Sequence, residues 1–152
     1  MNVSELLSIS RNIKSQNEYL ACIIYLQARE GLRISEILKI KDTDVSKSGN
    51  IKIHVSKSKE IKIVSAGEFS DFIVKLAKVN RGLLFQFNRF YVYREYRKLG
   101  IKTETVYGKK NAVTHAPRHI LASEIRKEVA GEGLSNKLNH KNSNSSKHYG
   151  KE

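Results

Sequence analysis

The sequence lacks the residues and runs that disulfides, metal clusters and membrane spans require. Its one cysteine, Cys22, cannot form an internal disulfide, and no Cys/His cluster has the spacing of a zinc site. With a single proline, Pro117, the chain has no Pro-rich linker. No apolar run is long enough to span a bilayer, and the N-terminal residues contain no secretory hydrophobic region. We therefore expect a cytoplasmic protein without a membrane partner.

Acidic residues are also scarce, because Asp and Glu total 15 against 28 Lys and Arg, giving a net charge of +13. Such an excess attracts polyanions, and nucleic acid is the usual partner. Charge alone leaves open a highly soluble basic protein or a ribosome-associated one. RNA binding lacks further support, because the sequence has neither an aromatic ribonucleoprotein signature nor a KH-type Gly-x-x-Gly loop.

The apolar pattern predicts a single α+β domain, mostly α, with one small antiparallel sheet. Helical spacing of apolar residues recurs in five segments, 16–29, 34–40, 68–79, 89–99 and 117–129. Gly31 and Gly100 are C-terminal signals, and Pro117 is favourable in a first helical turn. A period of two replaces helical spacing over about 51–64, which predicts a β-hairpin.

The hairpin is expected to have one wet face and a lysine-rich tip. Ile51 and Ile53 alternate with polar residues in the first strand, and Ile61 and Ile63 alternate with Lys62 in the second. The residues of the tip are Ser56, Lys57, Ser58 and Lys59.

Tyrosines are interleaved with arginines in the segment 89–99. An amphipathic helix with Tyr93, Tyr96 and Leu99 on its buried side is the favoured interpretation. A surface that contacts the DNA backbone is the alternative.

A small set of polar residues suits phosphodiester chemistry. Its members are Arg33, His115, Arg118, His140 and Tyr149. A phosphodiester under in-line attack spreads negative charge over its non-bridging oxygens, and two arginines can each fork onto those oxygens. A tyrosine hydroxyl, whose ordinary pKa is near 10, attacks readily in a cationic pocket or beside a base.

The oxygen that leaves in such a reaction needs a proton, which a flexible lysine on the hairpin can deliver. These motifs hold no carboxylate cluster, so they lack the ligands of a metal-dependent nuclease. We expect no metal, no cofactor and no small-molecule substrate.

Three segments resemble the motif boxes of the tyrosine recombinases, the phage-integrase class. GLRISEILKIKDTDV resembles their first-arginine box, THAPRHILAS their His-x-x-Arg-His box, and LNHKNSNSSKHY their Leu-Gly-His box with the terminal tyrosine. The hairpin SKSKEIKIV lies between the arginine boxes, as in the family. The nine-residue step from His140 to Tyr149 also matches, and the resemblance covers about residues 16–149.

The resemblance implies a nucleophile and a phosphate clamp. Tyr149 would attack the scissile phosphate, form a 3′-phosphotyrosyl bond and release a 5′-hydroxyl. Arg33 and Arg118 would clamp the phosphate.

It also implies the proton carriers and a further phosphate ligand. His115 would assist proton transfer, and His140 would hydrogen-bond a phosphate oxygen. Lys57 would be the general acid, with Lys59 as its substitute if the register of the hairpin differs.

The implied function is the breaking and rejoining of double-stranded DNA in recombination or integration, with further protomers, up to a tetramer, as candidate partners. Residues 1–152 would form a single catalytic domain without the family's N-terminal core-binding domain. Two other functions use the same residues: type IB topoisomerase-like nicking and resealing, and DNA binding by a catalytically silent regulator.

Overall fold

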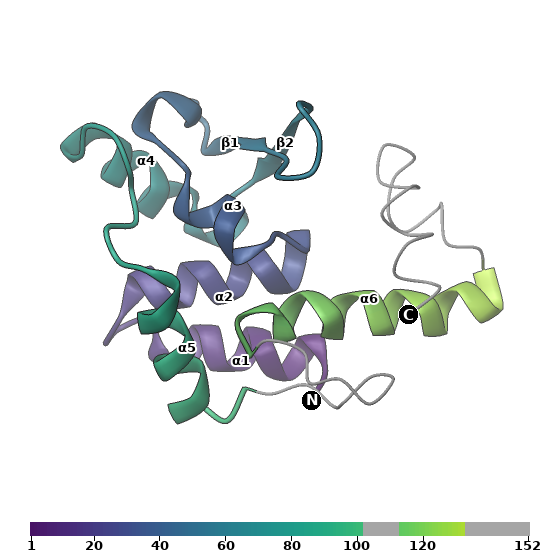
Figure 1. Ribbon diagram of the computed structural model, residues 1–152. Helices are drawn as coiled ribbons and strands as arrows, with labels where there is room; N and C mark the ends of the chain where they lie inside the picture. The colour runs from purple at the N-terminus through teal and green to yellow at the C-terminus, as the bar shows by residue number, and fades with distance from the viewer. Residues whose placement is uncertain (102–112, 133–152) are drawn as a thin grey trace.

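The computed structural model describes residues 1–101 and 113–132, except for the side chains of His115 and residues 130–132. These residues form helices and one hairpin, so the predicted fold class, mostly α with a small antiparallel sheet, is confirmed (Figure 1). The α-helices are α1 (Val3–Ile13), α2 (Glu18–Glu30), α3 (Ile34–Leu38), α4 (Ser70–Val79), α5 (Arg89–Lys98) and α6 (Ala116–Glu132). The strands are β1 (Asn50–His54) and β2 (Ile61–Ser65), and the 3-10 helices are η1 (Asp42–Asp44), η2 (Gly67–Phe69) and η3 (Val113–His115).

Helix α2 forms the centre of the core. Every residue from Leu20 to Ala28 is buried, so the helix is covered on all sides and not only on the broad apolar face that its sequence indicated. Figure 1 shows α3 on one side of α2, with α1 and α6 on the other. The hydroxyl of Ser10 in α1 donates to the carbonyl of Ala21 at 2.7 Å. This bond ties α1 to the first turn of α2, and the candidate site begins at the other end of the helix, after Glu30.

The hairpin confirms both predicted strands but reverses the face of the second. The antiparallel register sets Ile53 opposite Lys62, and these two side chains therefore share a face. Ile53 is buried and Lys62 is half-buried. Ile61 and Ile63 are 57% and 66% exposed, so the expectation that they alternate onto the dry face is wrong.

The cause of this reversal lies in the tip, which fixes the register. The N–H of Val55 donates to the carbonyl of Glu60 at 3.1 Å, and the N–H of Glu60 donates to the hydroxyl of Ser58 at 3.3 Å. Pairing of Val55 with Glu60 leaves Ile61 on the outer face. A slip of one residue would turn every side chain of the strand over.

Helices α4 and α5 confirm two more predicted segments, with two differences in side-chain burial. Val79, expected on the apolar stripe, is 70% exposed because it is the last residue of α4. In α5, Tyr96 is fully buried as expected, whereas Tyr93 is 39% exposed. The Tyr93 hydroxyl accepts a hydrogen bond from Arg97 at 3.0 Å, which keeps the ring at the surface.

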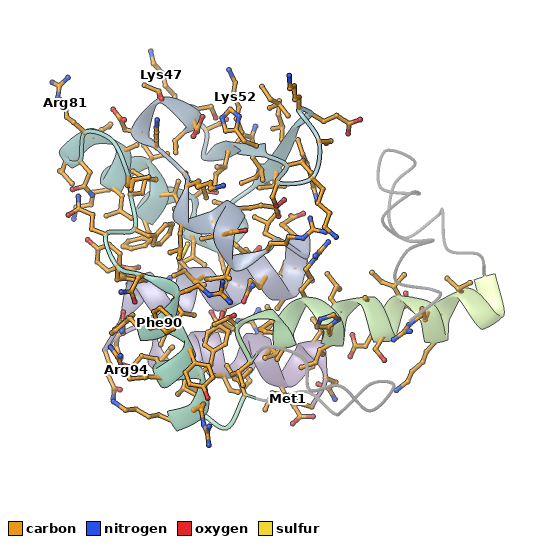
Figure 2. The ribbon with its side chains drawn as sticks, viewed as in Figure 1. Met1, Lys47, Lys52, Arg81, Phe90 and Arg94 are labelled. Carbon is orange, nitrogen blue, oxygen red and sulfur yellow. The ribbon has the colours of Figure 1, made fainter. Side chains whose placement is uncertain are left out.

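The outer surface carries many of the basic side chains. Lys47, Lys52 and Arg81 are exposed and point away from the body of the molecule (Figure 2). Of the helices in residues 1–101 and 113–132, none has the length and apolar character needed to cross a membrane. The C-terminal residues, 133–152, lie outside the described residues.

Candidate active site

Arg33 is held at the junction between α2 and α3. Gly31 ends α2 in the left-handed conformation, with φ at 66°, and its N–H donates to the carbonyl of Gln27 at 3.0 Å. Glycine adopts this conformation without the strain that a Cβ would cause. The turn makes Arg33 the N-cap of α3, and its side chain is only 18% exposed.

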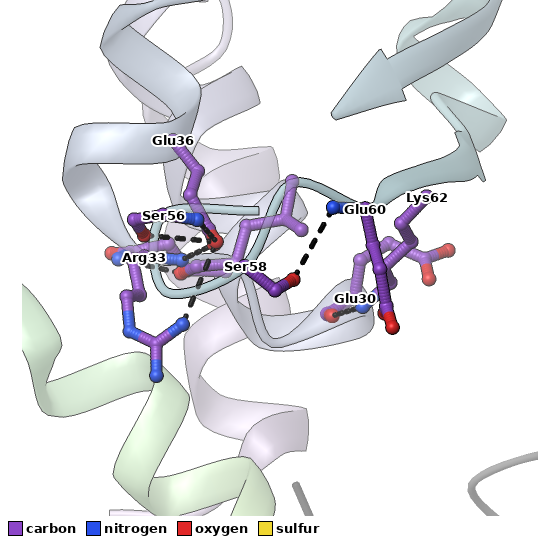
Figure 3. Close-up of polar contacts among 9 residues, drawn as sticks. Glu30, Arg33, Glu36, Ser56, Ser58, Glu60 and Lys62 are labelled. Atoms are coloured by element: carbon purple, nitrogen blue, oxygen red, sulfur yellow. Dashed lines mark hydrogen bonds and ion pairs between the residues drawn. The ribbon is translucent and has the colours of Figure 1, made fainter. Parts of the chain in front are cut away.

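A buried carboxylate, that of Glu36, ties Arg33 to the tip of the hairpin (Figure 3). Glu36 Oε1 accepts the backbone N–H of Arg33 at 2.8 Å, and Oε2 lies 3.5 Å from Arg33 Nη1. Oε2 also accepts the N–H and the hydroxyl of Ser56, at 3.2 and 3.1 Å. Burial opposes ionisation of Glu36, but the donors from Arg33 and Ser56 outweigh it and lower the pKa. An ionised Glu36 therefore links the first arginine to the hairpin.

Lys57 follows Ser56 directly, so the contacts of Glu36 hold its backbone near Arg33. Lys57 and Lys59 are both exposed in the tip. Lys57 alone of the two is adjacent to the residue that Glu36 anchors.

Helix α6 brings the second arginine to the same end of α2. A Cβ on Gly31, two residues before Arg33, would lie 3.3 Å from Leu121 Cδ2 of α6. Arg118 precedes Leu121 by three residues, so the two lie on the same face of α6. Arg118 is half-buried in the first turn of this helix. The two predicted arginines therefore lie on adjoining elements.

A buried glutamine connects the loop before Arg33 with the segment that carries His115. Gln27 Nε2 donates to the carbonyls of Leu32 and Thr114 at 3.1 and 3.0 Å. Its Oε1 accepts the hydroxyl of Tyr96 at 2.6 Å. These bonds fix the residue before Arg33 relative to the residue before His115, at the point where η3 leads into α6.

Lys62 of β2 reaches this region from the hairpin. Its Nζ donates to the carbonyl of Glu30 at 3.4 Å (Figure 3). Burial lowers the pKa of Lys62, the carboxylates of Glu30 and Glu36 act in the opposite direction, and Arg118 and Arg33 lower it further. Lys62 thus lies within electrostatic range of both arginines. We call Arg33, Arg118 and Lys62 the cation cluster.

The cation cluster is suited to an anion with several oxygen atoms, because each guanidinium can offer two parallel N–H donors. Phosphate has this shape and charge. Among the residues that the structure describes, no group of three or more His, Cys, Asp or Glu side chains is arranged to hold a metal ion.

The structure brings together the two predicted arginines and the tip that carries the predicted lysine. The other predicted positions lie outside the described part, namely the side chain of His115 and the whole of His140 and Tyr149. The catalytic roles of all six residues stay predictions.

Three residues of the site were not predicted from the sequence. Glu36 had a signal, because it stands three residues after the N-cap, where a carboxylate reaches back to the cap N–H. Gln27 had a weaker one, as a polar residue at the end of an apolar run. Lys62 had none, because the alternation of β2 indicated an exposed lysine.

Solved structures that share this fold include a recombinase and the catalytic domain of an integrase. The crystal structure of XerA recombinase superposes with a TM-score of 0.61 at 20% sequence identity, covering 95% of this chain and 57% of that one. The catalytic domain of bacteriophage HP1 integrase gives a TM-score of 0.58 at 24% identity, covering 97% of this chain and 83% of that one. This chain therefore spans little more than half the length of the XerA chain.

The sequence comparison agrees with the fold. The model of the phage integrase family matches residues 1–152, and the chain belongs to this family. No curated protein sequence matches it.

Proposed function

We propose that this chain cleaves and rejoins double-stranded DNA through a 3′-phosphotyrosyl intermediate on Tyr149, in site-specific recombination or DNA integration. The observation that carries the proposal is that Leu121 of α6 lies beside Gly31, which sets the helix that carries Arg118 against the turn that carries Arg33. Two arginines beside a lysine-bearing tip form a site for a phosphodiester under attack. Membership of the phage integrase family supports the same activity.

In the proposed cleavage, the hydroxyl oxygen of Tyr149 forms a bond to the scissile phosphorus while the bond from phosphorus to O5′ breaks. His115 assists removal of the tyrosine proton, and Lys57 gives a proton to the leaving O5′. The DNA is left with a free 5′-hydroxyl and a 3′-phosphate on the enzyme. Rejoining is the reverse reaction. A 5′-hydroxyl attacks the phosphorus and gives its proton to Lys57 while the bond from phosphorus to Tyr149 breaks, and Tyr149 regains its proton with the help of His115. One P–O bond forms for each that breaks, so no ATP is consumed.

The two arginines and the second histidine stabilise the negative charge of the transition state. Arg33 and Arg118 each fork onto non-bridging oxygens, which carry more negative charge in the transition state than in the ground state. His140 hydrogen-bonds one of these oxygens. Glu36 holds Arg33 in place and leaves the rest of its guanidinium to the phosphate.

Lys57 is favoured over Lys59 as general acid by the anchoring of the tip. Ser56 donates two hydrogen bonds to Glu36, and Lys57 follows it in the chain. A proton donor must lie within hydrogen-bonding reach of the leaving oxygen, so a fixed backbone next to the arginine is an advantage.

Double-stranded DNA is the proposed partner. Exchange of strands between two duplexes requires several cleaving protomers, so further copies of the chain on the DNA belong to the proposal.

Covalent trapping tests the proposed function. The probe is a library of nicked duplexes in which the short fragment released by cleavage diffuses away, so that the covalent complex persists after denaturation. We expect the wild-type protein to form an adduct and Tyr149→Phe to form none. Tyr93→Phe, which changes an exposed tyrosine on α5, is the matched control and should keep the adduct.

An adduct that persists in Tyr149→Phe contradicts the assignment of the nucleophile. A folded wild-type protein that binds DNA but gives no adduct with any substrate supports a binding-only regulator instead. Relaxation of supercoiled DNA without recombinant product supports the topoisomerase-like alternative.

A further inference from the structure

Lys62 lies on the inner face of the hairpin, although both of its neighbours in β2 are apolar residues. Its neighbours Ile61 and Ile63 are exposed, while Lys62 shares the inner face with buried Ile53. The opposite phase would expose Val64, which is buried here, but it would bury two isoleucines and return an ammonium group to water, so the observed arrangement costs free energy. Where a local rule is broken in this way, a functional reason is the usual explanation.

The surroundings of Lys62 supply little compensation for that cost. Its Nζ donates to the carbonyl of Glu30 at 3.4 Å, a long hydrogen bond to a neutral acceptor. In residues 1–101 and 113–132, no carboxylate lies within ion-pair distance of Lys62. Glu36, the nearby buried carboxylate, is engaged by Arg33 and Ser56. An ammonium carries three donors, so Lys62 has capacity for an anion.

We propose that Lys62 is the third cation of the phosphate site, and that its ammonium donates to a non-bridging oxygen of the scissile phosphate beside Arg33 and Arg118. The proposal rests on the proposed function and deepens it. Lys62 would stabilise charge and transfer no proton, a role distinct from that of Lys57.

The electrostatics of the free protein agree with an incoming anion. Burial and the two arginines lower the pKa of Lys62, whereas the carboxylates of Glu30 and Glu36 counteract them. A phosphate between the cations would stabilise the charged ammonium and move the pKa of Lys62 upward. Lysine is also a strong phosphate ligand as a point charge, next to guanidinium forks.

Titration of Lys62 itself gives the direct test. In protein with 13C-labelled lysine, the ε-methylene resonance of Lys62 is identified by its loss in Lys62→Arg. We expect it to titrate below the ordinary lysine pKa of 10.5 in the free protein. Saturation with a short DNA duplex should raise that pKa by about 1. Lys52, exposed on the opposite face of the same hairpin, is the matched control. A pKa of Lys62 that DNA leaves unchanged overturns the proposal, whether or not the protein cleaves DNA.

The rate of single-turnover cleavage tests the role of Lys62 in the reaction. Lys62→Met keeps the length of the side chain but removes its charge, and we expect cleavage to slow about a hundredfold. Lys62→Arg should recover most of the rate, and Lys52→Met should cleave like the wild type. The Tm of Lys62→Met should not fall, because a half-buried charge is removed. A lower Tm combined with an unchanged cleavage rate of the folded fraction would mean a structural role and would overturn the proposal.

A substrate with sulfur in place of the leaving 5′ oxygen separates charge stabilisation from proton donation. A thiolate leaves without being protonated, so this substrate should restore cleavage by Lys57→Met and leave Lys62→Met slow. Rescue of Lys62→Met would make Lys62 the proton donor and overturn its assignment as a charge ligand. Failure of the wild type to form any adduct counts against the proposed function instead, and the titration then decides the role of Lys62.

Discussion

Glu36 is the residue on which the geometry of the candidate site depends most. It is 6% exposed. Its carboxylate accepts the backbone N–H of Arg33 and both donors of Ser56, and it forms an ion pair with the guanidinium of Arg33. A buried carboxylate with this many partners stabilises the fold only while it is ionised and all partners are present. It also joins two elements that are far apart in sequence.

We expect Glu36→Gln to lower the free energy of unfolding by about 3 kcal/mol, because an amide cannot accept every donor that the carboxylate accepts. Chemical denaturation at neutral pH measures this change. Glu60→Gln, an exposed change in the same hairpin, is the control and should stay within about 0.5 kcal/mol of the wild type. Equal stability of Glu36→Gln and the wild type would contradict the structural role of Glu36.

The same pair of proteins gives a pH dependence. Because the pKa of Glu36 is lowered in the folded state from its ordinary 4.5, the unfolded chain binds more protons between those two values. The contribution of Glu36 is therefore fully present above pH 4.5 and is lost as the pH falls through the lowered value. The stability gap between wild type and Glu36→Gln should shrink below pH 4.5, and a gap that widens on acidification contradicts the assigned sign.

At the scale of elements, the sequence located α2 to α6 within a few residues, but it did not predict α1 and did not orient every side chain. Gly31 marked the end of α2 because its left-handed conformation is a local requirement. The inward face of Lys62 could not be predicted, because it depends on the register set by the tip and on the arginines of other elements. The same limit applies to Gln27, whose partners lie on α5 and η3.

The tip of the hairpin yields a prediction about its two lysines. Lys57→Met should slow single-turnover cleavage about a hundred- to a thousandfold, because the leaving oxygen would lack its proton donor. Lys59→Met should change the rate less than about threefold, since Lys59 is exposed and not adjacent to the anchored Ser56. A larger loss in Lys59→Met than in Lys57→Met would reverse the assignment of the general acid.

For the whole molecule, we expect charge to govern the proposed association with DNA. A net charge of +13, with exposed Lys47 and Arg81, favours contacts with phosphates over contacts with bases. If the domain makes about four phosphate contacts, its affinity for duplex DNA should fall about a hundredfold between roughly 50 and 200 mM salt. Fluorescence anisotropy at several salt concentrations measures this slope. An affinity that hardly changes over that range contradicts an electrostatic DNA surface.

The covalent bond to Tyr149 is the central claim, and mass spectrometry of the trapped adduct tests it most directly. Trypsin should release Tyr149 in the peptide of residues 148–151, between the cleavable bonds after Lys147 and Lys151. After nuclease trimming, we expect this peptide to carry a nucleotide joined through its 3′-phosphate to the tyrosine. A nucleotide on any other residue, or one joined through its 5′-phosphate, would contradict the proposed chemistry.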